Sequence, residues 1–126
     1  MTSATPFTAH EISELVDRFY AKVRLDDEIG PIFNETVESW PAHLALLKDF
    51  WTTVLTGERK YKGNPMVAHF PLKLAPQHFQ RWLSLFEETA GEVMTSEHAS
   101  IVLQRAEQIA ANIERMRTMY GAPTPA

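Results

Sequence analysis

Residues 8–23 read TAHEISELVDRFYAKV, and this stretch does most to decide the fold class. Its apolar side chains recur at intervals of three and four, which places them on one face of an α-helix. They are Ile12, Leu15, Val16, Phe19, Tyr20 and Val23. The hydroxyl of Thr8 can cap this helix while Glu11 bonds back to it, the pattern known as a capping box. The stretch therefore predicts an amphipathic helix that begins just after Thr8 and packs on a core.

Three further segments have the same helical period. The first opens at Pro41, where a proline suits the first turn of a helix, and it stops at Gly57. The second starts near Pro76, and the third starts near Ser96 and ends before Gly121. No segment alternates with period two over a useful length. The sequence thus predicts an all-α fold of four long helices, either an up-down bundle or a globin-like stack of two antiparallel pairs.

Two shorter pieces join the long helices. Gly30 and Pro31 interrupt the chain after the first helix, and we expect one tight 3₁₀-like turn there, carrying Ile32 and Phe33. Residues 65–71 predict a helix of little more than one turn, because a proline stands at each end. Each piece can hold a side chain at a fixed position between longer helices.

The composition indicates one domain over residues 1–126, with flexible tails at 1–7 and 121–126. Of the 126 residues 44% are hydrophobic, which suffices for a core without cross-links. The absence of cysteine excludes disulfides, thiolate-bound zinc, cysteine-held iron–sulfur clusters and cysteine nucleophiles. A net charge of -4 disfavours nucleic acid as the partner. The sequence shows neither a signal peptide nor a membrane-spanning stretch, so we expect a cytoplasmic protein without a membrane partner.

The five histidines limit the metal sites that the chain can build. They are His10, His43, His69, His78 and His98. None stands four residues from another or three residues after a glutamate, which disfavours a helical zinc site and a carboxylate-bridged di-iron site. Haem needs only one protein ligand, because its porphyrin supplies four nitrogens. His69 stands in the short proline-bracketed helix, where a ring nitrogen can be presented at a fixed position.

Three polar-tipped side chains lie on otherwise apolar helix faces. Tyr20 belongs to the first stripe, His43 precedes Leu47 by one turn, and Trp82 lies in the middle of the helix that starts near Pro76. Buried Tyr and Trp need partners for their O–H and N–H groups, so three such tips could converge on a small polar or anionic ligand. Taken one at a time, each is more readily explained as a core residue with its tip at the rim.

Aromatic and basic residues could supply the other parts of a cofactor site. Phe50 and Phe79 belong to aromatic stripes that could wall a cofactor, although such stripes are usually plain core. The loop at 59–62 places Tyr61 among basic side chains that could pair with carboxylates such as haem propionates. A solvated loop is the ordinary explanation of such a charge cluster.

A series of motifs covers roughly residues 12–115. They are Phe19-Tyr20-x-Lys22-Val23-Arg24, Gly30-Pro31-Ile32-Phe33-Asn34, His43 followed by Phe50-Trp51, Leu55-x-Gly57, Tyr61-x-Gly63-x-Pro65, His69, and His78-Phe79-x-x-Trp82-Leu83-x-Leu85-Phe86. In this order they resemble a group III truncated haemoglobin, and the likeness does not depend on any single motif.

The resemblance implies a truncated globin fold, a 2-on-2 sandwich of antiparallel helix pairs around haem b. It implies that His69 is the proximal iron ligand and that Tyr20, His43 and Trp82 are the distal, ligand-stabilising residues. The other cofactor-binding residues that we expect are Phe33, Leu47, Phe50, Tyr61 and Phe79.

We accordingly expect binding of O2, NO, CO or peroxide at the haem iron. Hydrogen bonds from Tyr20 and Trp82 would retain O2 firmly, which suits redox chemistry such as NO dioxygenase or peroxidase activity better than oxygen transport. No reductase domain fits within 126 residues, so an external reductase or other electron donor is expected. Two alternatives stay open: a six-coordinate electron-transfer haem protein with His43 as second iron ligand, and a haem-based sensor or interaction module.

Overall fold

The computed structural model describes residues 6–61 and 74–119, and these ranges contain five α-helices and no strand. The helices are α1 (Ala9–Leu25), α2 (Gly30–Thr36), α3 (Trp40–Thr56), α5 (Pro76–Val93) and α6 (Ser96–Met119). The predicted all-α class is therefore confirmed. None of the described helices is long and apolar enough to cross a membrane.

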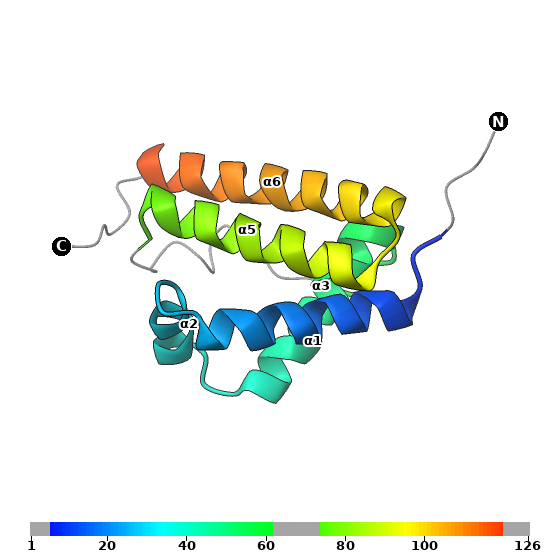
Figure 1. The fold of residues 1–126 in the computed structure, drawn as a ribbon, viewed down its shortest axis with the longest axis horizontal. Helices are drawn as coiled ribbons and strands as arrows, with labels where there is room; N and C mark the ends of the chain where they lie inside the picture. The colour runs from blue at the N-terminus through cyan, green and yellow to red at the C-terminus, as the bar shows by residue number, and fades with distance from the viewer. Residues whose placement is uncertain (1–5, 62–73, 120–126) are drawn as a thin grey trace.

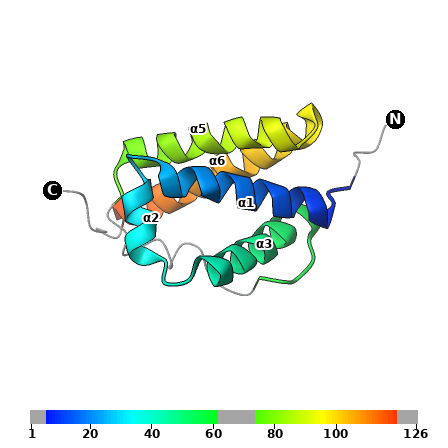
Figure 2. The ribbon, with the colours of Figure 1, turned by 60° about the horizontal axis from the view of Figure 1, so that its bottom comes forward.

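The long helices form two antiparallel pairs, as Figures 1 and 2 show. Helix α5 packs along α6, and α3 runs back beneath α1. The two pairs meet where α1 packs against α5. Of the two predicted arrangements, the chain adopts the stack of two pairs rather than the up-down bundle.

Helix α1 begins where the capping box predicts. The backbone N–H of Glu11 donates to Thr8 Oγ1 at 3.1 Å, and the N–H of Thr8 donates to Glu11 Oε2 at 2.9 Å. All six residues of the predicted stripe are buried. Packing extends one residue beyond the cap, because the ring of Phe7 stacks on His98 of α6 at 4.0 Å between centroids. The start of α1 is thereby tied to α6.

The connection after α1 differs from the prediction. Instead of one 3₁₀-like turn, α2 is an α-helix of seven residues, in which the N–H of Phe33 bonds to the carbonyl of Ile29 at 3.3 Å. Its first residue, Gly30, lies directly on the end of α1, where an added Cβ would be only 3.0 Å from the carbonyl oxygens of Val23 and Arg24. Glycine permits this contact, and a full α-turn then fits in the space. Local sequence signals do not report such a close approach between backbones.

Helix α3 begins one residue earlier than predicted, at Trp40, with the side chain of Ser39 as its N-cap and Pro41 in the first turn. It ends as predicted at Gly57, which has a left-handed φ of 83°. The N–H of Gly57 bonds to the carbonyl of Thr53 at 3.0 Å. Glycine adopts this φ at no steric cost, which explains the sharp end of the helix.

We expect Gly57→Ala to destabilise the protein by about 1–2 kcal/mol, the cost of a left-handed residue with a Cβ. A Cβ at Gly57 would meet no atom within 4 Å, so a steric clash does not contribute. The matched control is Gly91→Ala, in the last turn of α5 and equally open, which should stabilise by roughly 0.4–1 kcal/mol. Urea unfolding measures the free energy of unfolding of both variants. Equal changes in that free energy would contradict the explanation from the left-handed φ of Gly57.

Candidate functional site

An apolar pocket lies between the two helix pairs and is lined from all five described helices and the segments flanking them. It encloses about 940 Å³ of empty volume, including open solvent at its mouth. Its lining comprises Tyr20, Ile29, Phe33, His43, Leu46, Leu47, Phe50, Trp51, Tyr61, Leu74, His78, Phe79, Trp82, Ile109, Ala110 and Ile113. A large apolar cavity with a few polar tips is the usual form of a cofactor or small-molecule site.

Helix α3 supplies one wall of this pocket. Its predicted apolar stripe is present, but Trp51 is the only residue of α3 that is fully buried. Leu47 and Phe50 are half-buried because they face the pocket. Trp51 also lines the pocket, but it is buried because it packs on Phe86 of the core, with ring centroids 5.2 Å apart. The stripe therefore serves both the core and the pocket.

Eight of the nine residues predicted to form the site line this one pocket. They are Tyr20, Phe33, His43, Leu47, Phe50, Tyr61, Phe79 and Trp82. The ninth, His69, lies outside the described residues. The structure thus brings the predicted residues together, while their roles toward a cofactor stay predictions.

Tyr20 is almost fully buried, with 4% of its surface exposed. Its ring lies among those of Phe33, Trp40 and His43, with centroids 6.2, 6.1 and 6.4 Å away. Burial raises the pKa of the Tyr20 hydroxyl well above its ordinary value, although a hydrogen bond with Trp82 acts in the opposite direction. The hydroxyl consequently keeps its proton at neutral pH and can donate a hydrogen bond.

Trp82 is held from α5 by two core rings. It meets Phe19 edge to face at 5.3 Å and stacks on Phe86 at 5.4 Å between centroids. Trp82 lines the same pocket as Tyr20, and its indole N–H can only donate a hydrogen bond. The pocket therefore brings together two polar-tipped side chains, Tyr20 from α1 and Trp82 from α5.

His43 belongs to α3 and lies beside Tyr20. Its ring meets that of Tyr20 at 6.4 Å and that of Trp40 at 5.7 Å, edge to face in both cases. Trp40 is in turn covered by the guanidinium of Arg24, 4.7 Å from the ring centroid. These contacts place the imidazole on the same side of the pocket as Tyr20.

Tyr61 closes the pocket beyond the end of α3. Its backbone N–H donates to Thr53 Oγ1 at 2.9 Å, and its ring meets Phe50 edge to face at 5.1 Å. The neighbouring Arg59 and Lys60 are exposed, and Lys62 lies outside the described residues. An aromatic ring beside exposed positive charges is compatible with the prediction that this loop pairs with the carboxylates of a cofactor.

His78 lines the pocket as well, although the sequence pattern predicts no role for it. Its Nδ1 accepts a hydrogen bond from the backbone N–H of Ala75 at 2.8 Å, so the neutral ring carries its proton on Nε2. His78 stands one helical turn before Trp82, and that spacing after Pro76 was a signal that could have found it. The contributions of α6 to the pocket, including Ile109 and Ile113, were predicted only as helix stripe.

Comparison with known proteins identifies the family. The model of the bacterial-like globin family matches residues 8–117, which is most of the chain. The chain belongs to the bacterial-like globins. Over 115 residues this globin is 41% identical to the group 3 truncated haemoglobin of Campylobacter jejuni, covering 87% of the chain and 91% of the relative. The resemblance inferred from the motifs is thus confirmed.

Solved structures give the same result for the fold of this globin. It matches the crystal structure of the group III truncated haemoglobin from Campylobacter jejuni with a TM-score of 0.84 and 38% identity, covering 97% and 99% of the two chains. It matches the truncated oxygen-avid haemoglobin from Bacillus subtilis with a TM-score of 0.74 and 25% identity, covering 84% and 92%. The fold is the 2-on-2 truncated globin fold, and membership of this family implies haem-based ligand binding.

Proposed function

We propose that this globin binds haem b in the described pocket and uses it for redox chemistry on O2, NO or peroxide rather than for oxygen transport. The observation that carries the proposal is the convergence of Tyr20, His43 and Trp82, from three different helices, on one apolar pocket. We assign His69 as the proximal iron ligand on the resemblance to group III truncated haemoglobins.

The lining of the pocket fits a haem. A porphyrin is a flat apolar ring with two carboxylates at one edge, and the pocket offers aliphatic and aromatic side chains over most of its surface. Phe33, Leu47, Phe50 and Phe79 would exclude water from the ring faces, and Tyr61 would lie toward the carboxylate edge. When bound, the haem supplies an iron with one coordination position open to a diatomic ligand or peroxide.

The distal residues act on that ligand through hydrogen bonds. Because burial keeps the Tyr20 hydroxyl protonated, that hydroxyl can donate a hydrogen bond to a polar ligand in the pocket. A donor that already occupies its position stabilises negative charge on the ligand without reorganisation. His43 would add a second donor from α3.

Firm retention of the ligand is the reason for proposing redox chemistry. A carrier must release O2 readily, whereas a protein that holds O2 through a buried donor releases it slowly. The haemoglobin from Bacillus subtilis with the same fold is described as oxygen-avid. Conversion of NO and O2 to nitrate takes up one electron, and reduction of H2O2 to water takes up two electrons, so we propose an external reductase as the protein partner.

Haem titration followed by absorption spectroscopy tests the proposal. Purified protein should take up haem and give a Soret band that shifts on reduction and again on addition of CO. Leu47→Asp places a charge in the apolar pocket and should weaken haem uptake by at least about tenfold. The matched control is Leu25→Asp, because Leu25 is 85% exposed and does not line this pocket.

Failure of the wild type to hold haem, or equal uptake by both aspartate variants, would contradict the proposed site. The ferrous spectrum also tests the alternative in which His43 is a second iron ligand. A low-spin ferrous spectrum without added ligand would assign His43 as a second iron ligand and favour electron transfer.

A further inference from the structure

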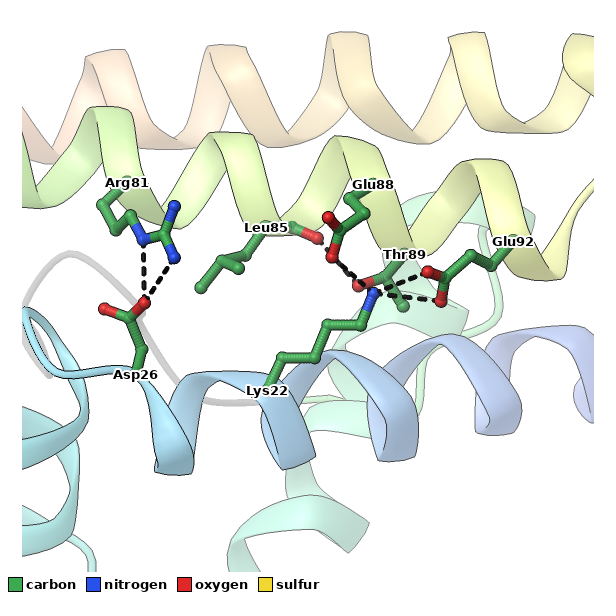
Figure 3. Close-up of polar contacts among 7 residues, drawn as sticks. All are labelled: Lys22, Asp26, Arg81, Leu85, Glu88, Thr89 and Glu92. Carbon is green, nitrogen blue, oxygen red and sulfur yellow. Dashed lines mark hydrogen bonds and ion pairs between the residues drawn. The ribbon is translucent and has the colours of Figure 1, made fainter.

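The junction of α1, α2 and α5 is organised around one carboxylate, Asp26. Its Oδ2 accepts from the backbone N–H groups of Glu28 and Ile29, both at 3.0 Å. Its Oδ1 accepts from Arg81 of α5, from Nε at 2.8 Å and from Nη2 at 2.7 Å (Figure 3). The carboxylate thus joins the end of α1, the start of α2 and the first half of α5.

Both carboxylate oxygens of Asp26 accept hydrogen bonds from these partners, and the side chain is buried. Its side chain is 6% exposed. Burial alone would raise its pKa, but the hydrogen bonds from Arg81, Ile29 and Glu28 outweigh burial and hold the pKa of Asp26 below its ordinary value. The carboxylate is therefore charged at neutral pH, and the pair with Arg81 is ionic.

Every element that the pair joins carries a residue of the proposed distal pocket. Tyr20 lies on α1, Phe33 on α2, and Trp82 on α5 directly after Arg81. Helix α2 also lies directly against the end of α1, because Gly30 approaches the carbonyl oxygens of Val23 and Arg24. A change at the pair would consequently move the Trp82 indole relative to the Tyr20 hydroxyl.

A second ion-pair group joins the same two long helices and offers a comparison. Lys22 Nζ lies 2.7 Å from Glu88 Oε2 and 2.9 Å from Glu92 Oε2 (Figure 3). This group is farther along α5, and its bonds do not reach α2 or the neighbour of Trp82. It holds α1 on α5 without touching the pocket wall.

We propose that Asp26 and Arg81 are positioning residues, whose ion pair sets the place of Trp82 against Tyr20 and of the α2 wall against both. The inference rests on the proposed function, because the arrangement that the pair maintains is the ligand-stabilising side of the pocket. The Lys22 group, by contrast, contributes to helix docking alone.

Asp26→Asn is the decisive variant. Its amide oxygen can still accept from the N–H groups of Glu28 and Ile29, so the turn into α2 is kept while the charge facing Arg81 is lost. We expect O2 dissociation to become about 3- to 10-fold faster. We expect hydrogen exchange of the Trp82 indole N–H to accelerate by a similar factor. NMR of the purified protein measures the exchange, with the resonance assigned by its loss in Trp82→Phe.

Two further variants separate positioning from general stability. Arg81→Lys keeps a positive charge, so it should accelerate O2 dissociation and indole exchange less than Arg81→Met does. Lys22→Met removes the other tie between α1 and α5 and should leave dissociation and indole exchange within about twofold of the wild type. Equal effects of Lys22→Met and Asp26→Asn, or no effect of Asp26→Asn on indole exchange, would overturn the inference. Failure to bind haem would overturn the proposed function, and the indole exchange would still test the pair.

Discussion

Replacing His69 by Gly is expected to abolish the five-coordinate ferrous spectrum of the haem-loaded protein and to lower its affinity for haem by at least about tenfold. The imidazole of His69 is the proposed bond between protein and iron, and glycine leaves space in its place. Added free imidazole should enter that space and restore the wild-type absorption bands. Spectra of the ferric, ferrous and ferrous–CO forms, with and without imidazole, measure the effect.

The described histidines provide the controls for this prediction. His10 and His98 do not line the pocket, and His98 bonds through Nδ1 to Glu11 at 2.7 Å. His43 and His78 do line it. Because His69 and not His78 is the proposed iron ligand, we expect His78→Gln to retain the wild-type haem spectrum. Loss of that spectrum in His78→Gln, with His69→Gly unaffected, would move the proximal ligand to His78.

Tyr20→Phe is expected to raise the O2 dissociation rate by roughly 10- to 100-fold. A hydrogen bond to a partly charged ligand contributes about 1.5–3 kcal/mol, and phenylalanine keeps the ring that packs on Phe33 and Trp40 while removing the donor. Stopped-flow displacement of O2 by CO measures the rate. Since burial raises the Tyr20 pKa, the hydroxyl stays protonated and the difference between variant and wild type should be constant from about pH 6 to pH 9.

Tyr61→Phe is the matched control for Tyr20→Phe. Both tyrosines line the pocket, but Tyr61 lies in the loop after α3, where its ring contacts Phe50. Removing the Tyr61 hydroxyl should change the O2 dissociation rate by less than about twofold. A wild-type rate in Tyr20→Phe, or an equal acceleration in Tyr61→Phe, would remove Tyr20 from the role of principal donor.

Local patterns in the sequence predicted the elements that depend on neighbours within one helical turn. The stripe of α1, the capping box at Thr8 and Glu11 and the stop at Gly57 are of this kind. Each depends on contacts three or four residues apart, or on one backbone angle, and such contacts can be read from spacing. Tyr20, His43 and Trp82 were candidates for the same reason, because a polar tip in an apolar stripe is visible without knowing its partner, whereas Phe33 and Leu47 were expected in the site only on the family resemblance.

The tertiary structure alone decided what those residues meet. It placed α2 against the carbonyls at the end of α1, which changed the expected 3₁₀-like turn into a helix, and it added His78 to the pocket. It also brought Trp82 and Tyr20, which lie more than sixty residues apart in the chain, to the same pocket. These relations depend on how α1 docks on α3 and α5, and docking is determined by side-chain packing across helices, which helical spacing does not contain.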